Sequence, residues 1–87
     1  MDSVDTKART WPDIEKTPTM RQVETAFDGQ DVRDVLLAAL TKTSRDADVV
    51  YVLGAKIGQQ LHEATISVWI RRLGIVKEAK EARANRL

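Results

Sequence analysis

The chain of 87 residues is long enough for one small domain with loose ends and too short for two domains. With no cysteine and one histidine, it excludes a disulfide framework and a thiolate metal site and argues against a histidine-based zinc site. No apolar run approaches the roughly 18 residues of a membrane span, and the first ten residues lack the order of a signal peptide. We therefore expect a cytoplasmic protein, associated with the nucleoid if the source is prokaryotic, without a membrane partner.

The net charge of +1 conceals an uneven distribution along the chain. Residues 1–40 carry eight Asp/Glu against five Lys/Arg, whereas residues 71–87 carry six Lys/Arg against two Glu. Such asymmetry directs one end of a protein toward a polyanion, but an ordinary solvated basic tail has the same composition. Charge alone leaves these two alternatives open.

The first 18 residues have little that could form a core. Trp11 and Ile14 are the only large apolar groups between Val4 and Met20, and two prolines interrupt the segment. We interpret residues 1–18 as a flexible N-terminal arm. Trp11 either packs onto the domain or contacts a partner. The helical domain is expected over residues 19–76.

Two helices are predicted in the first half of the domain. The first spans about 20–27 and begins with a capping box of Thr19 and Gln22. After the turn "DGQD", Asp31 is a good N-cap for the second. Leu37 lies off the apolar face, so it is covered by the arm or is available to a second subunit. The apolar faces are Met20, Val23 and Phe27 in the first helix and Val32, Val35, Leu36, Ala39 and Thr43 in the second.

The stretch "VVYVL", residues 49–53, has high strand propensity, and Gly54 and Gly58 disfavour a helix. However, a five-residue strand without a pairing partner would leave its backbone groups unsatisfied. The apolar residues from Val50 to Leu61 also fit one helical face. We therefore predict a helix over about 47–60, whose glycines let another helix approach closely, and leave the strand as an alternative.

Residues 61–63 predict a sharp turn before a helix over about 64–73. At about 100° per residue, Ile66, Trp69, Ile70 and Leu73 fall on one side of this helix, and Ala64, Val68 and Arg71 lie opposite. Residues 77–87 contain good helix formers but a weak apolar stripe. We expect them to form a basic C-terminal helix or tail.

Candidate catalytic groups are few. His62 adjoins Glu63, but the chain has no second histidine, no glycine-rich phosphate loop and no nucleophile elbow. A histidine in a turn is more often solvated than catalytic. We therefore expect a protein that is not an enzyme and has no cofactor, metal site or small-molecule ligand.

The second helix of the 47–73 pair has the form of a major-groove reader. Such a helix must be held by its inner face and must carry short residues on the outer side of its first turns. Thr65 and Ser67 can hydrogen-bond to bases or phosphates, and Ala64 and Val68 can touch a thymine methyl group. Arg71 can reach guanine or phosphate. The cations expected on phosphates are Arg72, Lys77 and Lys80, with weaker attraction from Arg83 and Arg86.

The sequence "ATISVWIRRLGI", residues 64–75, resembles the second helix of helix-turn-helix DNA-binding domains, in which a Thr-apolar-Ser-x-Trp-apolar pattern runs into basic residues and Leu-Gly. The resemblance covers roughly residues 45–76 and suggests a small homeodomain-like or repressor-like regulator. In this alignment Gln60 stands where the family usually has a glycine. The resemblance implies that the positions facing DNA bases are His62, Glu63, Ala64, Ser67, Val68 and Arg71.

The sequence thus predicts an all-α protein, a small helical domain of four or five short helices with a helix-turn-helix at about 47–73. The predicted function is sequence-dependent binding of double-stranded DNA by a small transcriptional regulator. Because a monomer of this size covers few base pairs, we expect a homodimer, with Leu37, Tyr51 and Val52 as contact candidates. The alternative is a small helical adaptor whose Val68–Arg71 face binds another protein and which does not bind DNA.

Overall fold

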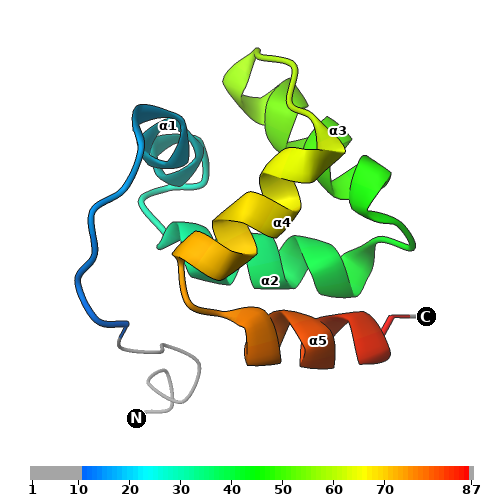
Figure 1. Ribbon diagram of the computed structural model, residues 1–87. Coiled ribbons are helices and arrows are strands. Elements are labelled where there is room, and N and C mark those ends of the chain that lie inside the picture. The colour runs from blue at the N-terminus through cyan, green and yellow to red at the C-terminus, as the bar shows by residue number, and fades with distance from the viewer. Residues whose placement is uncertain (1–10, 87) are drawn as a thin grey trace, which may run out of the picture.

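Five helices make up the computed structural model, which describes residues 11–86 and contains no strand in that range (Figure 1). The predicted all-α class is therefore confirmed. The helices are α1 (Pro18–Ala26), α2 (Val32–Lys42), α3 (Asp46–Ile57), α4 (Glu63–Arg72) and α5 (Val76–Ala84).

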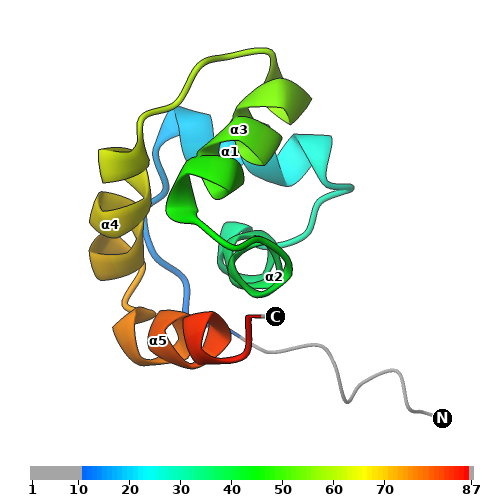
Figure 2. The ribbon, with the colours of Figure 1, turned by 90° about the vertical axis from the view of Figure 1, so that its right-hand side faces the viewer.

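Helix α2 lies at the centre of the arrangement and contacts α1, α3 and α5. Helix α5 runs beside α2, while α4 lies on the outside of the molecule and rests on α3 and α5 (Figures 1 and 2). Apolar side chains from all five helices meet in one core. Its largest fully buried members are Met20, Leu36, Leu40, Leu53, Ile66 and Ile75.

The N-terminal caps of the first two helices differ in how well the sequence predicted them. Helix α1 begins at Pro18 and is capped by Thr17, whose hydroxyl accepts a hydrogen bond from the Met20 amide at 3.2 Å. The predicted start with Thr19 as the cap is wrong, because proline is favoured in the first helical turn, where its missing N–H costs nothing. Asp31 caps α2 as predicted, accepting from the Arg33 amide at 2.8 Å.

The stretch 49–53, for which a helix and a strand were both considered, is helical, so the strand alternative is excluded. Helix α3 ends at Ile57 rather than at residue 60, because Gly58 adopts a left-handed conformation with φ of 67°. There the amides of Gly58 and Gln59 both donate to the Gly54 carbonyl, the latter at 2.9 Å. The connection to α4 therefore comprises residues 58–62, five residues in place of the predicted three.

Gly54 is required by a close backbone approach. A Cβ atom at this position would lie 2.5 Å from the carbonyl oxygen of Gln59. Gly54 thus leaves space for the backbone of Gln59, just after the end of α3, and not for a neighbouring helix as predicted. As a result the 58–62 segment folds back along α3 before α4 begins.

Helix α5 belongs to the same core as the rest of the domain. Of the two forms predicted for residues 77–87, a helix is observed, and Ala79 and Ala82 are buried where α5 packs on α2. Beyond the helix, Arg86 donates from Nε to the Leu40 carbonyl at 2.7 Å and from Nη2 to Asp46 at 2.9 Å. These bonds join the end of the chain to the α2–α3 junction.

The described part of the N-terminal arm, residues 11–17, lies against α2, whereas residues 1–10 of the predicted arm fall outside the described residues. Trp11 packs beside the core and donates from Nε1 to Asp34 at 3.0 Å. The Arg33 guanidinium lies 5.1 Å from the centre of the Trp11 ring and donates to the Pro12 carbonyl. Trp11 therefore packs onto the domain, as the first of its two alternatives predicted.

Arg33 is the charged residue at the centre of this contact, and only 2% of it is exposed. Its Nε and Nη2 atoms both donate to the Asp31 carboxylate at 2.8 Å, forming a two-point ion pair. Lys16 donates to the same carboxylate at 3.0 Å. Hydrogen bonds from Arg33 hold the pKa of Asp31 well below its usual range.

Replacing Asp31 by Asn should lower the free energy of unfolding by about 3 kcal/mol, because it leaves the Arg33 guanidinium buried without its counter-charge. Asn remains a good N-cap, so the loss reports the ion pair and not the cap. The matched control is Asp48→Asn, which breaks an exposed pair with Arg45 and should cost less than about 1 kcal/mol. Urea denaturation of both variants measures the difference, and equal losses would contradict this account.

Acid should destabilise the fold as pH falls below about 4. Burial alone would raise the pKa of Asp46, but hydrogen bonds from Arg83 and Arg86 lower it. Because the folded-state pKa values of Asp31 and Asp46 are both depressed, their stabilisation is complete above the ordinary value of 3.8 and is lost below it. Thermal melts between about pH 6 and pH 2.5 should show this loss, with a smaller fall for Asp31→Asn. An unchanged melting temperature down to the lowest pH would contradict the prediction.

Candidate nucleic-acid interface

Helix α4 is fixed to the domain by one apolar stripe. Ile66, Trp69 and Ile70 are buried, as is Leu73 directly after the helix. The stripe was predicted in full, because the four positions fall within about 100° of one another on a helix. Its burial against α3 and the core fixes which side of α4 faces outward.

The opposite side of α4 carries Ala64, Val68 and Arg71, which we call the outer line of α4. All three are exposed, and 48% of Val68 is accessible although it is an aliphatic residue. Ser67 and Arg72 are exposed on the two flanks, whereas Thr65 is half-buried. Small residues therefore occupy the first turns, and the arginines follow in the last turn.

Two of the predicted base-facing residues lie at the start of α4. His62 is the N-cap residue, with an extended backbone, and Glu63 is the first helical residue. Both side chains are exposed, and neither caps the helix. The Glu63 carboxylate favourably faces the positive end of the helix dipole. These groups lie at the end of the outer line that is farthest from the arginines.

The cations of the described chain divide into two groups. Five of the twelve Lys and Arg between residues 11 and 86 lie within 4.0 Å of a described carboxylate: Lys16, Arg33, Arg45, Arg83 and Arg86. The other seven form no ion pair with a described residue. Four of these seven are in α4 and α5, and all four are exposed: Arg71, Arg72, Lys77 and Lys80.

Helix α5 separates its charges onto two flanks. Lys77 and Lys80 form a basic flank on the same side of the helix as Arg83, which reaches Asp46 of α3 at 2.6 Å. Glu78 and Glu81 lie on the other flank, where they border a hollow beside the outer surface of α2. Because α4 also contacts α5, the unpaired cations of the two helices belong to neighbouring elements.

Arg83 and Arg86 differ from the sequence prediction, which assigned them to loose attraction of a polyanion. Both guanidinium groups are bonded to Asp46, at the start of α3. Both positive charges are thus paired with Asp46 within the fold. The same bonds neutralise Asp46, and Arg45 pairs with Asp48 at 3.1 Å, so neither acid at the start of α3 is left without a counter-charge.

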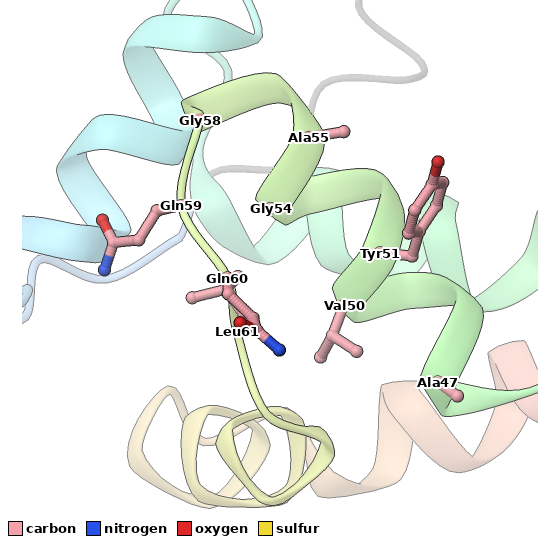
Figure 3. Close-up of a pocket in the computed structure, with 9 residues that line it drawn as sticks. All are labelled: Ala47, Val50, Tyr51, Gly54, Ala55, Gly58, Gln59, Gln60 and Leu61. Atoms are coloured by element: carbon pink, nitrogen blue, oxygen red, sulfur yellow. The ribbon is translucent and has the colours of Figure 1, made fainter.

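Sequence reasoning missed a hollow of about 560 Å³ between α3 and the 58–62 segment. Figure 3 shows Val50 on one wall and Gln60 and Leu61 on the other, with the ring of Tyr51 standing on the outer side of α3. The two glycines of α3 and its cap were the available signal, because they let the chain turn back at this point. We call it the α3 hollow; its lining is Ala47, Val50, Tyr51, Gly54, Ala55, Gly58, Gln59, Gln60 and Leu61.

Comparison with protein-family models, curated proteins and solved structures found no match for this chain. Among residues 11–86, none of the helices is both long and apolar enough to cross a membrane.

Proposed function

We propose that this protein binds double-stranded DNA in a sequence-dependent manner, as a small transcriptional regulator without catalytic activity. In this proposal α3 and α4 act as a helix-turn-helix with a five-residue connection, and α4 enters the major groove. The proposal rests on the outer line of α4 and on the four unpaired cations in α4 and α5, of which Arg71 belongs to that line.

The distribution of paired and unpaired cations is the observation that carries the proposal. Structural ion pairs take up the positive charge of Arg33, Arg45, Arg83 and Arg86. The four unpaired cations in α4 and α5 contribute no ion pair to the described fold. Such cations can neutralise DNA phosphates, and each neutralised phosphate releases a condensed counterion, which favours binding.

The dimensions of α4 support groove binding. A helix with side chains is about 10–12 Å across, and the B-DNA major groove is about 12 Å wide. Short residues at Ala64, Ser67 and Val68 would allow a close approach to base edges, with Val68 against a thymine methyl group. Arg71 would reach guanine or phosphate, and Thr65 and Arg72 would contact the flanking phosphates together with Lys77 and Lys80.

Two copies are expected on one DNA site. Ten residues of α4 span about 15 Å, which is less than half of the 34 Å helical turn of B-DNA. A single copy therefore reads few base pairs, and pairing on two half-sites would multiply its specificity. We propose a homodimer bound to two half-sites related by two-fold symmetry.

Binding to random duplex DNA should be detectable at low salt and should weaken by about 100-fold between 50 and 200 mM salt, because about four phosphates are neutralised. Replacing Lys77 and Lys80 by Ala should reduce the slope of log affinity against log salt by about 2. Fluorescence anisotropy with a labelled duplex measures both quantities.

The matched control is Arg21→Ala, which removes an exposed cation from α1, a helix that contacts neither α4 nor α5. Its salt slope should equal that of the unmodified protein. Absence of binding at about 20 mM salt would overturn the proposal and favour the adaptor, whose Val68–Arg71 face would then bind another protein.

The double variant Val68→Ser, Arg71→Ala should separate sequence reading from charge. Each lost base contact is worth about 1–3 kcal/mol, so affinity for the preferred sequence should fall by at least about tenfold. Affinity for random duplex should change by less than about threefold, since most phosphate contacts remain. Circular dichroism verifies the helix content, and an unchanged preference in a folded variant would show that α4 is not the reader.

A further inference from the structure

Val68 lies in the middle of the outer line of α4 and is the only large apolar side chain that this helix exposes. Ala64 lies about one helical turn before it and Arg71 about one turn after it, and both are exposed. Of these three side chains, only the Arg71 guanidinium can form hydrogen bonds. The middle of the outer line therefore recognises an apolar group and not a hydrogen-bonding one.

The apolar group that the major groove offers is the methyl group on C5 of a pyrimidine. Among the four ordinary bases only thymine carries it. 5-Methylcytosine carries the same methyl group on the same ring atom, and the two bases differ at C4, where thymine has an oxygen acceptor and cytosine an amino donor. Because the Val68 side chain has neither a donor nor an acceptor, its contact with the methyl group does not distinguish these two bases.

Ser67, the exposed neighbour of Val68 on the flank of α4, preserves this tolerance. Its hydroxyl group both donates and accepts, and the hydrogen rotates to suit the partner. The same side chain therefore donates to the oxygen of thymine or accepts from the amino group of 5-methylcytosine. A carboxylate at this position would favour the cytosine base, and an ammonium group would favour thymine. Ser67 imposes neither preference.

Arg71 is placed to contact the base pair next to the methylated one. It lies about 4.5 Å beyond Val68 along the axis of α4, which is comparable with the spacing of about 3.4 Å between base pairs. Arginine most often reads guanine, by donating to both O6 and N7. The Arg71 guanidinium forms no ion pair with a described residue, so its donors remain available for this contact.

We infer that α4 recognises the C5 methyl group of one pyrimidine through Val68, so that this position of the site accepts thymine or 5-methylcytosine and disfavours cytosine. Methylation of a cytosine at this position therefore strengthens binding, which makes the protein sensitive to DNA methylation. The inference rests on the proposed function and deepens it. If the protein binds a preferred sequence without regard to the methyl group, the proposed function stands and the inference fails, whereas absence of binding to any duplex overturns both.

Duplexes that differ by a single methyl group test the inference. In the sequence selected from a random duplex pool, each thymine is replaced in turn by uracil, and at the sensitive position also by 5-methylcytosine and by cytosine, each with its own pairing partner. Loss of the methyl group, from thymine to uracil and from 5-methylcytosine to cytosine, should weaken binding by about three- to fivefold, the value of one buried methyl group. Fluorescence anisotropy measures these affinities. A site with no sensitive thymine, or a methyl effect confined to the thymine–uracil pair, would overturn the inference.

Val68→Ala should abolish the methyl effect, because the shorter side chain does not reach the methyl group; the affinity ratio of the thymine and uracil duplexes should fall to about 1. Alanine favours helices, so α4 is retained, and circular dichroism verifies it. Val76→Ala is the matched control: it shortens another exposed valine, 57% accessible and outside α4, and should leave the ratio unchanged. A folded Val68→Ala variant that keeps the full ratio would overturn the inference, since the methyl group would then act through DNA shape.

Discussion

The close approach of the Gln59 backbone to Gly54 is the constraint on which the placement of α4 depends. Because no Cβ atom intervenes, the chain turns back at Gly58 and runs along α3 for the five residues 58–62. Helix α4 then begins on the outside of the molecule and is held there by its apolar stripe. The same turn leaves the α3 hollow beside it, so the proposed reading helix and this hollow have a common structural origin.

The predictability of the fold depended on whether the determining contacts were local. The stripe of α4 and the cap of α2 were correctly predicted, because helical periodicity and N-cap preference act within a few residues. The start of α1 was misplaced by two residues and the end of α3 by three, because Pro18 and Gly58 competed with plausible neighbouring signals. The apolar pattern continues past Gly58 to Leu61, so the helix was extended to residue 60 and the connection was predicted too short.

The roles of the charged residues were less predictable, because their partners are distant in the sequence. Arg83 and Arg86 appeared to be members of a basic tail, yet they bind Asp46, which is 37 and 40 residues away. Arg33 similarly reaches back to Pro12 while pairing with Asp31. The four cations that remain unpaired in α4 and α5 belonged to the predicted site, and their distinction from the structural arginines required the three-dimensional structure.

A selection of bound sequences from a random duplex pool tests most directly whether α4 reads DNA. We predict one enriched motif composed of two related halves in inverted orientation, each a few base pairs long and containing thymine opposite Val68. The same selection with the Val68→Ser, Arg71→Ala variant should lose preference at those positions and keep the binding that depends on phosphates. A pool without enrichment, or the same motif from both proteins, would contradict the assignment of α4 as the reading helix.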